Sequence, residues 1–304
     1  MTITIGTPPV RRRMGWIVVA LLAMIALLAA GCGGAGTNGA GGGGQRIVRV
    51  LYAGSLVSIM EKTIGPAFAK ATGYQYRGYG AGSSQIANEL QGKIRQGDVF
   101  ISADPAVDTK LMGPNGFVSW YTTFARSPLV LAYNPGSKFA DQLKTKPWYE
   151  VVSQPGFRLG GTDPKLDPKG KLAAQAVQQV AKDQNQPGMA EQINRNLTVF
   201  PETDLVGRLQ AGQLDAGFFY SIESADLGDP TASLSPVNLA AQYTITVLNQ
   251  AANPAGGEAF VKYLLGSQGT TTLKEHGFEL IQQPKVSGNQ ASVPKDLQSV
   301  VGAG

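Results

Sequence analysis

The sequence predicts an α/β protein with two sets of strands and helices, each set forming a mostly parallel sheet flanked by helices. The first observation is that three strand–turn–helix units follow one another after residue 46. The second is that the same alternation returns from Phe157 onward. Successive units of this kind place their strands parallel in one sheet. The third is composition, because 43% hydrophobic residues with 39 Gly and 18 Pro are typical of a folded, loop-rich protein.

The N-terminal segment predicts a signal peptide. Arg11 to Arg13 precede an apolar run from Trp16 to Ala30, and a charged start before a short apolar core is typical of secretion. The run is shorter than the roughly 20 residues that a membrane-spanning helix needs. Residues 28–31 resemble a bacterial lipobox, although Ala29 stands where leucine is usual. We expect cleavage before Cys32 and its lipidation; a simple cleaved signal and an uncleaved anchor are the alternatives.

The mature chain has almost no net charge. Cleavage removes three arginines and no acid, so 23 basic and 21 acidic residues leave +2. That balance offers no basic footprint for nucleic acid, so we expect no nucleic-acid partner. One Cys and one His exclude an internal disulfide and a His/Cys zinc site. The Gly-rich residues 33–45 predict a flexible tether, so we expect an extracytoplasmic or periplasmic protein held by lipid to the outer face of the cell membrane.

The first set follows from apolar residues at helical spacing between short β runs. Small residues end each run, as at Ala53-Gly54-Ser55. We expect, in order, a strand at 47–51, a helix at 56–68 bent by Gly65-Pro66, a strand at 74–79, a helix through Ile86, Leu90 and Ile94, and a strand at 99–101.

The second set repeats this pattern. We expect strands at 128–133, 157–160, 197–200 and 216–220, a loop at 161–170, and helices at 172–181 and through Val206 and Leu209. A late strand at 243–248 and a late helix at 255–265 follow this set. The chain therefore enters one lobe, crosses to another and returns. The expected boundaries are a signal peptide at 1–31, lipidated Cys and tether at 32–45, lobe 1 at 46–130, lobe 2 at 131–240, and a return segment with C-terminal tail at 241–304.

Several strand-to-helix turns carry Gly and Ser, as in Gly54-Ser55 and Gly82-Ser83-Ser84. Ligands of open α/β sheets bind beyond the carboxyl ends of strands. Helix N-termini there present free N–H groups and a positive dipole end, and Gly allows close backbone approach. Such turns predict an anion site without Lys or Arg, although Ser is also the commonest plain N-cap.

Three segments resemble the first lobe of the periplasmic molybdate-binding protein family: Val50–Leu56, Gly80–Ser84 and Gly97–Asp104. The resemblance continues along the chain to about residue 278 through the segments Ser127–Tyr133, Gly161–Pro164, Asp204–Leu209, Ala216–Tyr220 and Phe260–Phe278. It implies a two-lobed type II periplasmic-binding-protein fold with a hinge. It also implies a monomeric receptor that carries molybdate or tungstate to an ABC permease and its ATPase, with no cofactor and no free metal ion.

The family's site implies that neutral donors hold the oxyanion. Carried over by position, the donors would be the hydroxyls of Ser55, Ser83 or alternatively Ser84, and Tyr220, with backbone N–H groups of Lys169 and Leu205. Neutral donors avoid the desolvation of a buried counter-cation, and a dianion strengthens each hydrogen bond that it accepts.

Two carboxylates raise an alternative. A second branch of the family uses two carboxylates to reach the metal atom, and Asp163 or Asp167 could supply one of them. The other would precede the Tyr, where this chain has Phe219, and Glu223 is expected to be structural or interlobe. The plainer interpretation is that both aspartates form turns around Pro.

Other classes have weaker support. A receptor for sulfate or phosphate would share the fold, and a ferric-ion receptor lacks the expected adjacent tyrosine pair. For a secreted serine hydrolase, Ser292-x-x-Lys295 contains Pro294 and lies in a tail expected to be frayed. His276, which would be the only candidate base, is expected to cap a helix. We therefore expect a binding protein and not an enzyme.

Overall fold

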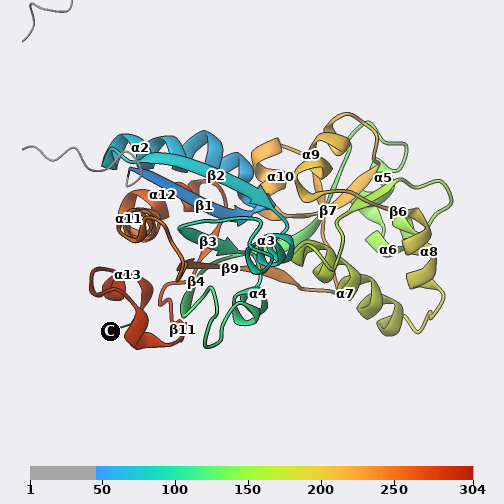
Figure 1. Ribbon diagram of the computed structural model, residues 1–304. Coiled ribbons are helices and arrows are strands. Elements are labelled where there is room, and N and C mark those ends of the chain that lie inside the picture. The colour runs from blue at the N-terminus through green and yellow to red at the C-terminus, as the bar shows by residue number, and fades with distance from the viewer. Residues whose placement is uncertain (1–45, 304) are drawn as a thin grey trace, which may run out of the picture. The chain divides into compact units, whose positions relative to one another are not determined.

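The computed structural model describes residues 46–303, which belong to one compact unit (Figure 1). The predicted signal peptide, Cys32 and the Gly-rich tether lie outside the described residues. Among those residues, no helix combines the length and apolarity that crossing a bilayer requires.

The described strands form one 11-stranded sheet. They are β1 (Ile47–Ala53), β2 (Gln75–Ala81), β3 (Val99–Ser102), β4 (Trp120–Tyr133), β5 (Leu159–Gly161), β6 (Leu197–Val199), β7 (Ala216–Tyr220), β8 (Thr231–Ala232), β9 (Ala240–Val247), β10 (Glu279–Leu280) and β11 (Val286–Gly288). Their order is β2-β1-β3-β9-β4-β7-β5-β6, with β8, β10 and β11 pairing with β4.

The sheet has two regions joined by β4. In region A, β1 pairs in parallel with β2 and β3, and β9 runs antiparallel to β3. In region B, β5 pairs in parallel with β6 and β7. The first part of β4 pairs with β9, and from Leu129 to Tyr133 it pairs with β7. The parallel strands of each set were predicted, and the antiparallel junction of β4 with β9 and β7 was not. The lobe boundaries at 130/131 and 240/241 stay a prediction.

Helices cover both regions (Figure 1). They are α1 (Val57–Ile59), α2 (Gly65–Thr72), α3 (Ser83–Gln91), α4 (Pro105–Lys110), α5 (Ala140–Thr145), α6 (Trp148–Val152), α7 (Pro168–Asp183), α8 (Met189–Asn196), α9 (Glu202–Gln210), α10 (Ser221–Leu227), α11 (Pro254–Leu265), α12 (Ser267–Glu275) and α13 (Gln298–Val301). In Figure 1, α2, α11 and α12 lie beside β1 and β2, whereas α5, α6 and α8 lie at the opposite end. β3 and β7 are buried along their whole length, as strands covered on both faces are.

The first long helix is irregular before Gly65-Pro66. A 3₁₀ turn at Gly54–Leu56 leads into α1, and a π-helical turn at Met60–Ile64 leads into α2. The N–H of Gly65 donates to the carbonyl of Met60, five residues back. Pro66 has no N–H and its ring collides with the carbonyl four residues earlier, so the widened turn accommodates it without a break in the helix.

Two expectations about helix and chain ends are wrong. Ile94 does not belong to the second helix, because α3 ends at Gln91 and Ile94 is 78% exposed. The C-terminal tail is not frayed within the described residues. β11 pairs with β4, and Val293, Leu297 and Val301 are buried, so apolar contacts fix the tail against the sheet.

Aromatic residues pack in the interior. Trp120, Tyr121, Trp148 and Tyr149 are all buried. The Trp148 indole N–H donates to the Leu234 carbonyl at 3.1 Å, which satisfies its one polar atom.

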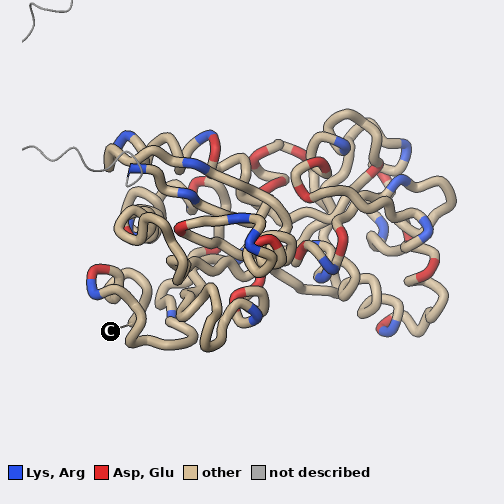
Figure 2. Tube along the Cα trace, in the orientation of Figure 1, with Lys and Arg blue, Asp and Glu red and all other residues tan. Residues whose placement is uncertain are grey.

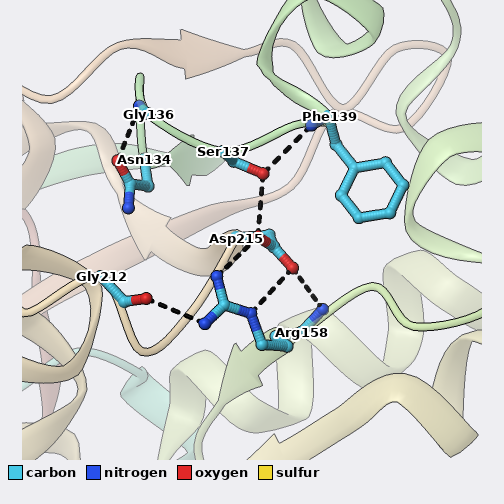
Figure 3. A network of polar contacts seen from close by, with 7 residues as sticks. All are labelled: Asn134, Gly136, Ser137, Phe139, Arg158, Gly212 and Asp215. Atoms are coloured by element: carbon cyan, nitrogen blue, oxygen red, sulfur yellow. Dashed lines mark hydrogen bonds and ion pairs between the residues drawn. The ribbon is translucent and has the colours of Figure 1, made fainter.

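Asp215 joins three loops of region B (Figure 3). Its carboxylate accepts from the Arg158 Nε at 3.1 Å and Nη2 at 2.8 Å, and from the Ser137 hydroxyl at 2.8 Å. Arg158 also donates to the Gly212 carbonyl. Burial opposes ionisation of Asp215, but the bonds from Arg158 outweigh it and lower its pKa. Residues before β5, before β7 and after β4 are thereby held together.

Charges of both signs are interspersed along the trace (Figure 2). Acidic segments gather at α9 and α10. The acidic residues there include Glu202 and Glu223, which are buried.

Candidate functional site

A buried lysine lies where the two sheet regions meet. Lys169 is in the first turn of α7, and its side chain is 0% exposed. Its Nζ lies 2.7 Å from Glu223 Oε1 and 3.4 Å from Glu202 Oε1. Asp167, which is also buried, precedes it. We call Asp167, Lys169, Glu202 and Glu223 the Lys169 cluster. The sequence predicted an anion site of neutral donors, and a buried ammonium among three acids was not predicted there.

Glu202 connects the cluster to region A. It is the first residue of α9, after β6, and its Oε1 accepts from the backbone N–H of Ser55 at 3.0 Å. Gly54 lies so close that a Cβ there would stand 2.5 Å from Glu202 Oε2. The absence of a side chain at Gly54 allows the Glu202 carboxyl to approach the end of β1.

Glu223 holds α10, in agreement with its expected structural role. Its Oε2 accepts from the backbone N–H of Tyr220 at 2.8 Å, while Oε1 receives Lys169. The carboxylate thus occupies a capping position and neutralises the buried ammonium.

Asp163 and Asp167 both form turns, as the plainer interpretation expected. Asp163 Oδ1 accepts from Lys165 N at 2.8 Å, and Asp167 Oδ1 accepts from Lys169 N at 2.6 Å. The Lys169 amide, a predicted ligand donor, is therefore already bonded. Asp167 is the N-cap of α7, but its second oxygen, Oδ2, is buried without a partner among residues 46–303.

The predicted hydroxyls have different surroundings. Ser55 Oγ hydrogen bonds with the Tyr243 hydroxyl at 2.9 Å. Ser83 Oγ accepts from Ala103 N at 3.1 Å, and Ser84 is half-buried at the start of α3. The Tyr220 side chain is 0% exposed, and its hydroxyl has no hydrogen-bond partner in the described part of the chain.

The predicted amide at Leu205 is also bonded, because its N–H closes the first turn of α9 onto the Pro201 carbonyl at 3.3 Å. The N–H groups that helix geometry leaves without a helical acceptor are those of Glu202 and Thr203. They stand at the positive end of the helix dipole, and Thr203 lines a cavity. The predicted helix N-terminus is present, but its available amides lie two and three positions before Leu205.

Two cavities meet at Glu202. One of about 410 Å³ is lined by Gly54, Ser55, Glu202, Thr203 and Glu223, among others. The other, of about 230 Å³, is lined by Gly82, Thr162, Asp167 and Glu202, among others. Both cavities are lined by residues that follow strands of region A and by residues that follow strands of region B. Each could admit a small solute.

Burial and mutual repulsion set the charges of the carboxyl groups. Burial, with repulsion by Asp167, raises the pKa of Glu202 to about 8. Burial also raises the pKa of Asp167 and of Glu223. Burial works against the ammonium of Lys169, but attraction by Glu223, Glu202 and Asp167 outweighs it and raises the pKa of Lys169. At neutral pH Lys169 is charged and Glu202 is mostly protonated.

Both tyrosines at the site remain protonated. Burial raises the pKa of Tyr220 and of Tyr243 well above the ordinary value, and their rings pack edge to face with centroids 6.1 Å apart. A protonated phenol is a hydrogen-bond donor. The site therefore combines an ammonium, two phenols, hydroxyls and a helix N-terminus, which together can bind an anion.

Three site residues were missed in the sequence. The Lys169 side chain, Glu202 and Tyr243 come from α7, α9 and β9. Only Glu202 had a signal, because an acid at the first position of a helix that follows a strand suits the helix dipole. Within residues 46–303, no group of three or more His, Cys, Asp or Glu is placed to hold a metal ion.

The comparisons with known proteins agree with one another. The model of the family described as bacterial extracellular solute-binding protein matches residues 48–279. An uncharacterized solute-binding protein of Petrotoga mobilis is 28% identical over 296 residues, covering 84% of this chain and 90% of that protein. The molybdate/tungstate-binding protein WtpA of Pyrococcus abyssi is 24% identical over 319 residues, covering 85% of this chain and 91% of that protein.

Among solved structures, the periplasmic molybdate-binding protein of Azotobacter vinelandii has a TM-score of 0.59 at 18% identity. The structural match covers 77% of this chain and 100% of the Azotobacter vinelandii chain. At this identity the likeness shows the fold, and it confirms the predicted periplasmic-binding-protein architecture. The resemblance inferred from the sequence motifs is likewise confirmed.

Proposed function

The chain belongs to the family of bacterial extracellular solute-binding proteins, and on this premise we propose that it binds a tetrahedral oxyanion beside the Lys169 cluster. Molybdate or tungstate is the proposed ligand, since two relatives that match this chain over most of their length are named molybdate/tungstate-binding proteins. The observation that carries the proposal is the Tyr220 hydroxyl, a buried donor without a partner in the described residues. Leaving such a group unsatisfied is costly, and an oxyanion oxygen would accept from it.

The neighbouring groups suit the same ligand. The Lys169 ammonium lies 5.4 Å from the centre of the Tyr220 ring, and the Ser55 and Tyr243 hydroxyls lie within hydrogen-bond distance of each other. The amides of Glu202 and Thr203 add the dipole of α9. The donor set proposed here therefore includes one cation, the Lys169 ammonium. The hydroxyl of Ser83 or Ser84 would add a further donor from region A. Lys169 and Leu205 would not contribute backbone amides.

The proposed route begins outside the cytoplasm. Lipidation of Cys32 would hold the protein to the outer face of the membrane, and residues 33–45 would serve as a tether. The monomeric protein would close on the oxyanion and deliver it to an ABC permease and its ATPase. Hinge closure around a ligand is a known type of transition.

Sulfate or phosphate is the alternative ligand, because either is a tetrahedral anion that the same donors could hold. The hydrolase has less support. Ser292 is exposed in a short 3₁₀ turn, and His276, at the end of α12, is paired with Asp226 at 2.7 Å. The family is one of solute-binding proteins.

A melting screen with molybdate, tungstate, sulfate, phosphate and ferric ion tests the proposal. A ligand at one hundred times its Kd stabilises the folded protein by about 2.7 kcal/mol. We expect an increase in Tm with molybdate and tungstate, smaller with sulfate and phosphate. Ester or β-lactam turnover without any shift in Tm would favour the hydrolase instead.

Tyr220→Phe removes the proposed donor and keeps the ring. We expect the affinity for molybdate to weaken by about 1–3 kcal/mol, or roughly 5- to 150-fold, because the oxyanion loses a buried hydrogen bond. Titration calorimetry measures it. Tyr133→Phe, at the end of β4, is the matched control and should bind as the wild type does. Equal affinity in both variants would remove Tyr220 from the site.

A further inference from the structure

Glu202 has an oxygen for which its surroundings provide no donor. Its Oε1 accepts from Ser55 N and faces Lys169, whereas Oε2 is buried without a partner within residues 46–303. The side chain is 2% exposed and borders both cavities. The Glu202 side chain therefore lies beside a solute that occupies either cavity.

The groups that face Glu202 carry an excess of acid. Asp167, the N-cap of α7, and Lys169, in its first turn, face Glu202, as does Glu223 from α10. Tyr220 of β7 and Tyr243 of β9 lie near it as well. The wall of the larger cavity adds Glu61, Lys62 and Asp226. The cluster itself has three carboxyl groups for one ammonium. A dianion beside three ionised carboxylates would be strongly repelled.

A proton removes that repulsion. A protonated carboxyl group is neutral and has an O–H that donates. Glu202 and Asp167 both line the smaller cavity, repulsion by Asp167 acts on Glu202, and each has one buried oxygen without a partner within residues 46–303. The two groups can therefore share one proton in the absence of a ligand.

We propose that Glu202 is a ligand-binding residue that acts as a donor, so that the oxyanion binds together with a proton held on Glu202 Oε2. This inference rests on the proposed function. One dianion and, where Glu202 is ionised, one proton from solvent enter the site; Oε1 continues to accept from Ser55 N. The O–H then turns from Asp167 to an oxygen of the ligand. Glu202 thereby makes the receptor specific for anions under conditions that keep the proton in place.

The consequence is a pH dependence with a defined sign. The pKa of Glu202 is about 8 without ligand, and a bound dianion would raise it further. Binding must then take up protons between the two values, and affinity must fall as pH rises through that range. We expect Kd to increase by up to about tenfold per pH unit above pH 8.

Titration calorimetry of the whole protein with molybdate tests this in two buffers of different ionisation enthalpy at each pH, with Tris and TAPS for the alkaline measurement and MES and imidazole for the acidic one. Phosphate is avoided because it is itself a tetrahedral oxyanion. We expect uptake of up to about three quarters of a proton per molybdate at about pH 8.5, where Glu202 is already partly protonated, and almost none at about pH 6.5. A tenfold or smaller loss of affinity would accompany each unit of increase in pH.

Glu202→Gln keeps an oxygen for Ser55 N and provides a permanent N–H donor. It should bind molybdate with nearly the wild-type affinity at neutral pH, without proton uptake and without pH dependence. Glu191→Gln, on the exposed face of α8, should behave as the wild type does. Melting curves establish that each variant is folded, and the wild-type proton count stands even if Glu202→Gln does not fold.

The outcomes separate the two proposals. Molybdate binding by the wild type without proton uptake at about pH 8.5 overturns the role of Glu202 and leaves the proposed function intact. Proton uptake that persists in Glu202→Gln also overturns it. Absence of binding by any oxyanion at any pH overturns the proposed function and this inference together.

Discussion

Lys169 is the residue on which the charge balance of the site depends. Its ammonium is buried between Glu223 and Glu202, and it also lies over the Phe219 and Tyr220 rings. Removal of one partner from a buried ion pair leaves an uncompensated charge in a medium of low polarity. The folded state therefore depends on Lys169 even without a ligand.

Lys169→Met should lower the free energy of unfolding by about 3–5 kcal/mol, because Glu223 would lose its ammonium partner while remaining buried. The double variant Lys169→Met/Glu223→Gln should recover part of that loss, since the second change neutralises the acid. Urea unfolding measures both. Lys144→Met, which breaks an exposed pair with Asp141, should leave stability almost unchanged. A Lys169→Met variant as stable as the wild type would show that the cluster is not ionised.

At the scale of residues, the sequence predicted positions better than roles. Ser55 and Ser83 do stand after β1 and β2, and Tyr220 ends β7, because small or polar residues follow each apolar run. The side chain of Lys169 could not be predicted in this way, since Asp-Pro-Lys-Gly describes a helix start and lysine is normally exposed there. Its burial depends on Glu202 and Glu223, which are 33 and 54 residues further along the chain.

Two elements interlock beside the site. The start of α3 contacts the turn before α7, where Gln85 N donates to the Leu166 carbonyl at 2.9 Å. Gly82, the N-cap of α3, has φ −54° and ψ 132°, a conformation that any residue adopts. A Cβ on Gly82 would nevertheless lie 2.4 Å from the Leu166 carbonyl oxygen. Glycine is required there for the contact between elements and not for the backbone conformation.

Gly82→Ala should therefore hold α3 away from that turn while leaving each element folded. We expect at least tenfold weaker molybdate binding, about 1.4 kcal/mol, and a larger radius of gyration by X-ray scattering in the presence of ligand. Gly207→Ala in α9 is the matched control, because nothing lies within 4 Å of its added Cβ. Wild-type affinity in Gly82→Ala would mean that the two elements need not touch when the ligand binds.

At the scale of the molecule, the alternation of strands and helices in both sets was predictable because each buried strand is apolar and the main helices have their own periodicity. The short helices α4, α5, α6, α8 and α10 were not predicted. The antiparallel junction of β4 with β9 and β7 was not predictable from the sequence. β4 runs for 14 residues through both regions, and its partner changes from β9 to β7 at Pro128. Proline is normally found at the start of a strand and not in its middle, so the sequence predicted a strand that begins at residue 128. The short strands β8, β10 and β11 have too few residues to show a period, and they form only because β4 offers them an edge.

Two buried acids, Asp108 and Glu202, determine how the free energy of unfolding varies with pH. Burial raises the pKa of Asp108 to about 8, as it does that of Glu202. Each group is protonated in the folded state and ionised in the unfolded state between about pH 4 and pH 8. Such a group gives its full stabilisation below its unfolded pKa, and the stabilisation is lost as pH rises through the folded value. Asp215 and Glu89, whose pKa values are lowered, act in the opposite direction but only in acid.

Stability should therefore fall as pH rises from about 5.5 to 8.5, by up to about 1.4 kcal/mol per unit for each of the two groups. Asp108 accepts from the Thr244 hydroxyl at 2.5 Å, and Asp108→Asn keeps that acceptor while removing the titration. Urea unfolding at three pH values should show a shallower decline in Asp108→Asn than in the wild type. A free energy of unfolding that is constant or increases over this range would mean that the buried carboxyl groups are ionised in the folded protein.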